Sequence, residues 1–108
     1  MPERTIVGYI RVREVVEPAP EGGFVSLCPE LGVASQGETI DDALTSLQEA
    51  IETFLDTLAE LGDRETYLNE RGVKVFLAEP LEETSISVKP GEVVSTFVAA
   101  IGHGLIPA

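Results

Sequence analysis

Few side chains in this sequence could act as nucleophiles, proton carriers or metal ligands. His103 is the only histidine, set between two glycines near the end, and Cys28 is the only cysteine. A structural zinc site needs several Cys or His ligands, and a Ser–His–Asp arrangement would depend on His103 alone. There is no G-x-S-x-G pattern and no EF-hand spacing. We therefore predict no catalytic residue, no metal site and no cofactor, and interpret Cys28 as a small buried hydrophobe.

Carboxylates dominate the remaining polar chemistry. Nineteen Asp and Glu stand against seven Lys and Arg, giving a net charge of −12 over 108 residues. The stretch from Glu14 to Asp63 contains twelve of the acids and no base, so it carries the whole imbalance. This charge repels phosphates, which predicts no direct nucleic-acid binding and no membrane binding. Two interpretations stay open: a solvated surface, or a surface that matches a basic partner.

The carboxylates must be positioned by an ordinary small domain. No apolar run approaches the roughly 18 residues of a membrane span, and the N-terminus lacks the apolar segment of a signal peptide. We therefore expect a cytoplasmic protein. Alternating apolar residues predict a strand over Thr5–Val16, and short strands follow at Phe24–Cys28 and Val33–Gln36, separated by Pro and Gly. These three pieces suggest an antiparallel meander.

The strongest pattern in the chain predicts a long amphipathic helix. Apolar residues recur at spacings of three and four from Ile40 to Leu61, which gives a helix of about 22 residues. Thr39 is a good N-cap, and Gly62 is a natural end. The opposite face carries Gln48, Glu49, Glu52, Asp56 and Glu60. The apolar stripe fits either a helix laid on a sheet or a coiled-coil seam, and a short α+β chain favours the sheet.

The last third of the sequence is more ambiguous. A short helix is predicted from Asp63 through Glu70, a strand over Val73–Leu77, and a brief strand over Ser85–Lys89. In the tail, helical spacing and strand propensity disagree, and we give slight preference to a helix. So apolar a tail should pack on the body or on a second copy. Its candidate self-association residues are Val94, Phe97, Val98 and Ile101.

One segment carries a family resemblance. Residues 22–43 read GGFVSLCPELGVASQGETIDDA: an aromatic strand ending in Cys-Pro-acidic-Leu, then Ser-Gln-Gly-acidic-Thr, then acids and Ala that open a helix. This segment resembles the HicB-like antitoxin family, and the resemblance extends over about residues 5–77. The family usually carries Leu-Pro-Gly-Cys where this chain has Leu31, Gly32 and Val33, so the turn here is one residue shorter.

The resemblance implies an α+β fold: a three-stranded antiparallel sheet, one long packed helix and a further strand (β-β-β-α-β), similar to part of a ribonuclease H. It places a HicB-like domain in residues 1–78 and leaves residues 79–108 as a C-terminal extension. HicB proteins bind a small basic HicA toxin, an mRNA-cleaving ribonuclease. Many also carry a C-terminal DNA-binding domain, but Lys89 is the only base in residues 78–108, so none is predicted here.

The resulting functional prediction is a HicB-like antitoxin that masks a basic HicA-type toxin stoichiometrically and is not an enzyme. We expect it to form a homo-oligomer, a dimer or a tetramer. The candidate partner-binding residues lie on the helix and in the loop that precedes it: Glu49, Glu52, Asp56 and Glu60, and Glu30 and Glu38. An orphan interaction module without a toxin is the alternative. A metal-dependent nuclease is a remote third, because that chemistry needs clustered carboxylates.

Overall fold

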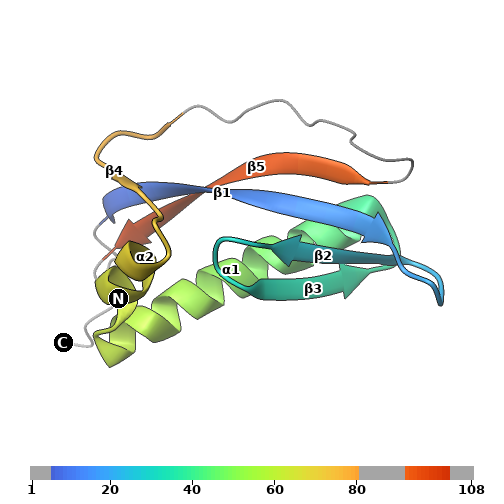
Figure 1. The fold of residues 1–108 in the computed structure, drawn as a ribbon, viewed down its shortest axis with the longest axis horizontal. Helices are drawn as coiled ribbons and strands as arrows, with labels where there is room; N and C mark the ends of the chain where they lie inside the picture. The colour runs from blue at the N-terminus through green and yellow to red at the C-terminus, as the bar shows by residue number, and fades with distance from the viewer. Residues whose placement is uncertain (1–5, 81–91, 103–108) are drawn as a thin grey trace, which may run out of the picture.

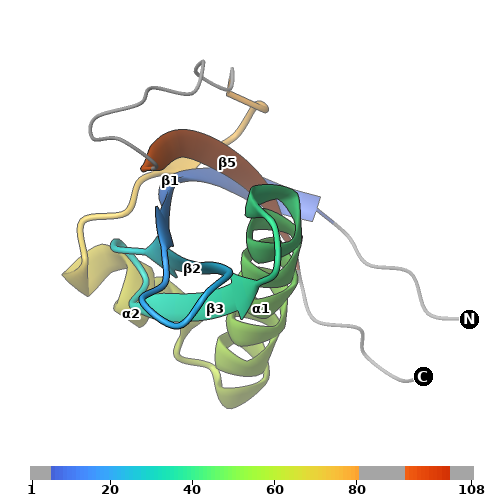
Figure 2. The same cartoon turned by 90° about the vertical axis from the view of Figure 1, so that its right-hand side faces the viewer.

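The computed structural model describes residues 6–80 and 92–102, which form an antiparallel sheet with a long helix on one face (Figure 1). The elements follow the chain in the order β1 (Ile6–Pro18), β2 (Phe24–Cys28), β3 (Val33–Gly37), α1 (Ile40–Leu61), α2 (Arg64–Glu70), β4 (Val75–Phe76) and β5 (Val93–Gly102). Seen along its length, the sheet curves and α1 closes its open side (Figure 2). The α+β fold predicted from the sequence is confirmed. No helix in the described ranges is long and apolar enough to cross a bilayer.

Strand β1 is the centre of the sheet and has partners along both edges. One edge pairs antiparallel with β2 at Val15–Pro18, and β2 continues to β3. The same edge meets β4 at Tyr9 and Ile10. The other edge is lined by β5, which runs antiparallel to β1 from Val16 back to Ile6. The predicted meander is therefore present, and a long fifth strand completes it.

The slight preference for a helix in the tail is wrong, because residues 93–102 form strand β5. Its Val, Thr, Phe and Ile residues suit a pleated strand. Pairing with β1 also satisfies backbone groups that a helix would leave open along that edge of the sheet. The strand predicted over Val73–Leu77 is reduced to Val75–Phe76. The brief strand predicted over Ser85–Lys89 and the residue His103 lie outside the described ranges.

Helix α1 begins and ends where its capping residues predict. The Thr39 hydroxyl accepts a hydrogen bond from the Asp42 N–H at 3.0 Å, and Thr39 has extended backbone angles. Gly62 is left-handed (φ 76°), and the N–H groups of Gly62 and Asp63 return to the Ala59 and Leu58 carbonyls. Such an ending satisfies carbonyls that the helix leaves unpaired, and only Gly adopts this φ without strain.

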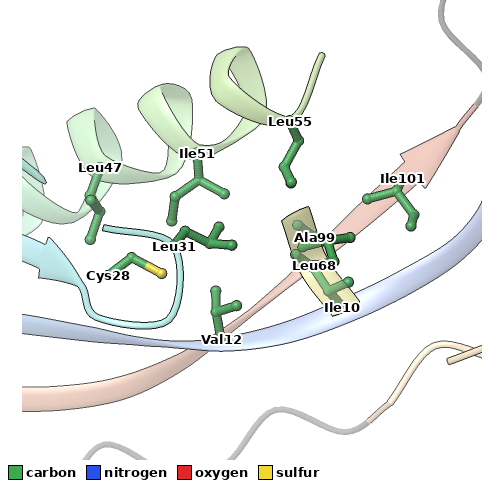
Figure 3. Packing of buried hydrophobic residues seen from close by; sticks show 10 residues of the cluster. All are labelled: Ile10, Val12, Cys28, Leu31, Leu47, Ile51, Leu55, Leu68, Ala99 and Ile101. Carbon is green, nitrogen blue, oxygen red and sulfur yellow. The ribbon is translucent and has the colours of Figure 1, made fainter. Parts of the chain in front are cut away.

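The core lies between α1 and the inner face of the sheet (Figure 3). It joins side chains from five elements and one turn: Ile10, Val12, Cys28, Leu31, Leu47, Ile51, Leu55, Leu68, Ala99 and Ile101. Cys28 is fully buried there, as predicted. Burial, the largest cause, raises the pKa of the Cys28 thiol to about 11, with smaller upward contributions from the Glu30 and Glu14 carboxylates. The thiol is therefore protonated at neutral pH and does not act as a nucleophile.

Two details of the inner face differ from the sequence prediction. In the alternating pattern that predicted the first strand, Ile6 shares a face with Ile10 and Val12, but a register shift between Ile6 and Gly8 turns it outward, and it is 53% exposed. Gln48 was expected in solvent, but it is half-buried and donates from Nε2 to the Glu14 carboxylate at 3.2 Å. Glu14 itself is only 2% exposed. A second buried polar contact runs from the Ser26 hydroxyl to the Ala43 carbonyl at 2.9 Å and ties β2 to α1.

Candidate partner-binding surfaces

The acidic face of α1, defined as Glu49, Glu52, Asp56 and Glu60, is a continuous row on the side of the helix opposite the core. The spacings of three and four residues place neighbours one turn apart on the same face. Glu49, Glu52 and Glu60 are exposed, and Asp56 is half-buried. The buried positions Leu47 and Ile51 hold the helix so that this face points away from the sheet. The structure thus brings the four predicted helix acids together.

This row is unfavourable for the helix by itself. Like charges three or four residues apart each cost a helix about 0.2–0.5 kcal/mol, and Glu49 and Glu52 form one such pair of exposed acids. Glu60 also lies in the last turn, where the helix dipole disfavours an acid, and no base in that turn offsets it. A basic partner would relieve both effects. The acidic face therefore has a physical reason to attract positive charge.

A shallow depression of about 570 Å³ borders the acidic face on the side of β3. It is lined by Val33, Ser46, Glu49, Ala50, Thr53, Phe54 and Thr57. Apart from Glu49, these side chains are uncharged, and several are small. Interfaces gain most of their energy from desolvated apolar anchors, with charges at the rim. A partner that contacts Glu49 would therefore also meet an apolar floor at Ala50 and Phe54.

Glu30, predicted in the loop before the helix, already has a partner within the chain. Its two carboxylate oxygens each lie 3.2 Å from the Arg13 backbone nitrogen and accept its N–H, and Oε2 also accepts the Arg13 Nε–H at 3.1 Å. Arg13 lies on β1 between the stretch paired with β2 and the stretch paired with β4. The Glu30 side chain therefore takes the place of a neighbouring strand at this point, a role that nothing in its sequence context indicated.

Glu38 is exposed in the short link between β3 and α1. Glu30 precedes β3 and Glu38 follows it, so a five-residue strand of about 17 Å separates them. The two loop acids do not form one cluster. Their part in partner binding stays a prediction, with Glu30 largely committed to Arg13.

The four predicted self-association residues divide between the two faces of β5. Ile101 is 3% exposed and belongs to the core, and Phe97 packs against that core. Val94 and Val98 are half-buried on the opposite face of the sheet, since their β1 partners are Val15 and Arg11. Ile101 is thus engaged within its own chain.

Two basic residues lie together at a place that sequence patterns did not predict. The Arg11 guanidinium and the Lys74 ammonium lie 5.8 and 5.2 Å from the centre of the Phe76 ring, within cation–π range. They line a hollow of about 290 Å³ together with Glu30, Gly72, Val73 and Phe76. These residues come from β1, from the turn between β2 and β3, and from the segment after α2, so only the tertiary fold brings them together.

Arg64 is a buried base that sequence spacing also missed. It is 3% exposed, donates from Nη1 to the Gly102 carbonyl, and donates from Nη2 to Glu65 at 2.8 Å. This contact fastens the start of α2 to the end of β5. Within residues 6–80 and 92–102, no three His, Cys, Asp or Glu side chains are arranged as a metal site.

This chain is similar to known proteins over less than half of its length. UPF0150 protein ssl0738 and UPF0150 protein ssr1765, both from Synechocystis sp. (strain ATCC 27184 / PCC 6803 / Kazusa), are 38% identical to this chain over 47 and 45 residues. The matches cover 43% and 41% of this chain, and the chain spans only 65% and 57% of the length of these relatives. No family model matches the chain, and no solved structure matches it significantly.

Proposed function

We propose that this chain is a HicB-like antitoxin that binds a small basic HicA-type ribonuclease in the cytoplasm and covers its active surface. The observation that carries the proposal is the acidic face of α1, with three exposed carboxylates and one half-buried carboxylate on a helix that has no Lys or Arg. The similarity to two UPF0150 proteins and the HicB-like segment of residues 22–43 support the same reading. Inhibition would be stoichiometric, with no chemical step performed by this chain.

In this mechanism the charges and the apolar depression beside them have different roles in binding. Carboxylates at the rim would attract a basic partner from a distance and raise the association rate, especially at low salt. Contact would also remove the repulsion along the helix. Retention of the partner would come from apolar anchors seated against Ala50 and Phe54, since exposed ion pairs contribute little by themselves.

The test begins with a tagged chain recovered from its native cytoplasm. We expect a small basic protein at close to one copy per chain, with an RNA-cleaving activity that stops when purified chain is added. A variant with Glu49, Glu52 and Glu60 changed to Lys reverses the acidic face, and it should lose both recovery and inhibition. Asp56 is left unchanged because it is half-buried.

The matched control changes three exposed acids away from α1, Glu17, Glu21 and Glu70, to Lys. It alters the net charge by the same amount and should still bind and inhibit. If the helix variant inhibits as well as the unaltered chain, the acidic face is not the binding surface. Recovery of only further copies of this chain would favour the orphan interaction module. Metal-dependent cleavage of an RNA–DNA hybrid would favour the nuclease.

A further inference from the structure

The outer edge of β3 presents backbone groups whose direction follows from a contact in the first turn of the sheet. In an antiparallel sheet, the N–H and C=O of successive residues point alternately to the two edges of a strand. The Ala19 N–H donates to the Gly23 carbonyl at 2.9 Å, so the odd-numbered residues of β1 point toward β2. The register then makes the even-numbered residues of β2 bond to the odd-numbered residues of β3, such as Ser35. The backbone groups of Ala34 and Gln36 are therefore directed away from β2.

This edge is open to pairing in the part of the chain that the structure describes. There the sheet ends at β3, whose single strand partner is β2 (Figure 1). Ala34 and Gln36 are exposed, and five residues is an ordinary strand length. Natural edge strands often carry a charge or a proline that blocks pairing with another chain, but β3 carries neither. The edge therefore offers two N–H donors and two C=O acceptors to an extended segment.

The helix side of this edge also has room for added side chains. The depression of about 570 Å³ lies between Val33 on β3 and the middle of α1. A strand paired with β3 would lie about 4.8 Å from it and would point every second side chain to the helix side of the sheet. Such side chains would cover Ala50 and Phe54, which are half-buried in the chain alone. An added strand would thus gain apolar contact as well as hydrogen bonds.

The charges around the edge favour a basic segment over a second copy of this chain. Glu38 follows β3 directly and Glu49 lines the depression, and both are exposed. At the other end of β3, Glu30 is paired with Arg13, and the Arg71 guanidinium lies beside the turn that precedes the strand. The remaining charge beside the edge is therefore negative. A second copy would bring the same acids to the same edge, whereas a basic segment would neutralise them.

We propose that an extended, basic segment of a partner protein adds to the outer edge of β3 as a further strand of the sheet. This inference rests on the proposed function, because the basic toxin is the partner expected to supply the segment. Main-chain hydrogen bonds to Ala34 and Gln36 hold the segment, and its alternate side chains in the depression select it. Its basic residues lie near Glu38 and Glu49. The toxin therefore binds through a strand or an extended terminus and not through a helix.

The experiment measures amide exchange by NMR on the labelled chain, alone and in complex with the basic protein recovered with it. In the complex, the Ala34 and Gln36 amides should exchange at least about tenfold more slowly than in the chain alone, because a hydrogen bond must open first. The Ser35 amide, which points to β2, is the internal control and should be protected in both states.

Variants at one position test the same contact through affinity. Ala34→Pro removes an outward N–H and leaves the β2–β3 hydrogen bonds in place, so the chain should fold. It should bind the basic protein at least about tenfold more weakly, because one hydrogen bond is lost and the ring occupies the edge. Ala34→Val keeps the N–H and should bind as the unaltered chain does. Circular dichroism checks the fold of both variants, and amide exchange on the unaltered chain decides if Ala34→Pro does not fold.

The outcomes separate this inference from the antitoxin proposal. A complex that inhibits the toxin while the Ala34 and Gln36 amides exchange as in the chain alone would overturn the inference and leave the antitoxin proposal intact. Binding of Ala34→Pro at full strength would do the same. If no basic protein is recovered, both proposals fail. Protection of the two amides in the chain alone, rising with its concentration, would place a second copy at the edge and also overturn the inference.

Discussion

Removing the Glu30 carboxylate should destabilise the sheet, because this side chain completes the hydrogen bonding of β1. In Glu30→Ala the Arg13 N–H loses its acceptor, and a backbone hydrogen bond contributes about 1 kcal/mol net, more when the acceptor is charged. The ion pair with the Arg13 side chain adds little, because that side chain is 58% exposed. We therefore expect the free energy of unfolding to fall by about 1–2 kcal/mol. Glu30→Gln keeps an acceptor oxygen and should cost under about 1 kcal/mol.

Urea unfolding followed by circular dichroism measures both variants. With a slope of about 1–3 kcal/mol per molar urea for a small domain, Glu30→Ala should lower the midpoint by roughly 0.3–2 M with the slope unchanged. Glu38→Ala is the control: an exposed acid beside the same strand, expected to change stability by less than about 0.5 kcal/mol. The reasoning fails if Glu30→Ala costs no more than Glu38→Ala, or if Glu30→Gln is as damaging as Glu30→Ala.

Two further predictions concern burial. The Cys28 pKa is about 11 in the folded chain against 9.0 for an ordinary thiol, so above pH 9.0 only the unfolded chain loses the proton. The free energy of unfolding should then fall by about 1.4 kcal/mol per pH unit up to about pH 11, and urea titrations of Cys28→Ala should lack this component. Gly37→Ala would place a Cβ against the Ala43 nitrogen and 2.6 Å from the Asp42 carbonyl carbon, which are backbone atoms of α1. We expect thermal unfolding to show that Gly37→Ala lowers the free energy of unfolding by about 3 kcal/mol. Gly62→Ala, where only the positive φ is strained, should lower it by about 1 kcal/mol. Equal losses for the two variants would contradict the clash.

The sequence was most informative where one local pattern decided the structure. The apolar repeat of α1, its Thr39 cap and its Gly62 end all act within a few residues, so the helix was predicted with the bounds that it has. The prediction of a helix in the tail was wrong for the opposite reason. Residues 93–102 fit a helical spacing, but their structure depends on the open edge of β1, more than seventy residues earlier in the chain. Local periodicity contains no information about such a partner.

The candidate site also divides into features that local sequence decides and features that depend on distant residues. The acidic face could be predicted because one helix places all four residues. The role of Glu30 could not be predicted, because it depends on where the pairing between β1 and β2 stops. That pairing reaches only to Val15, so the Arg13 N–H is left for a side chain to accept. The burial of Glu14 on the inner face of β1 could not be predicted either, because its hydrogen bond from Gln48 comes from a distant helix. Each of these contacts joins residues at least seventeen positions apart.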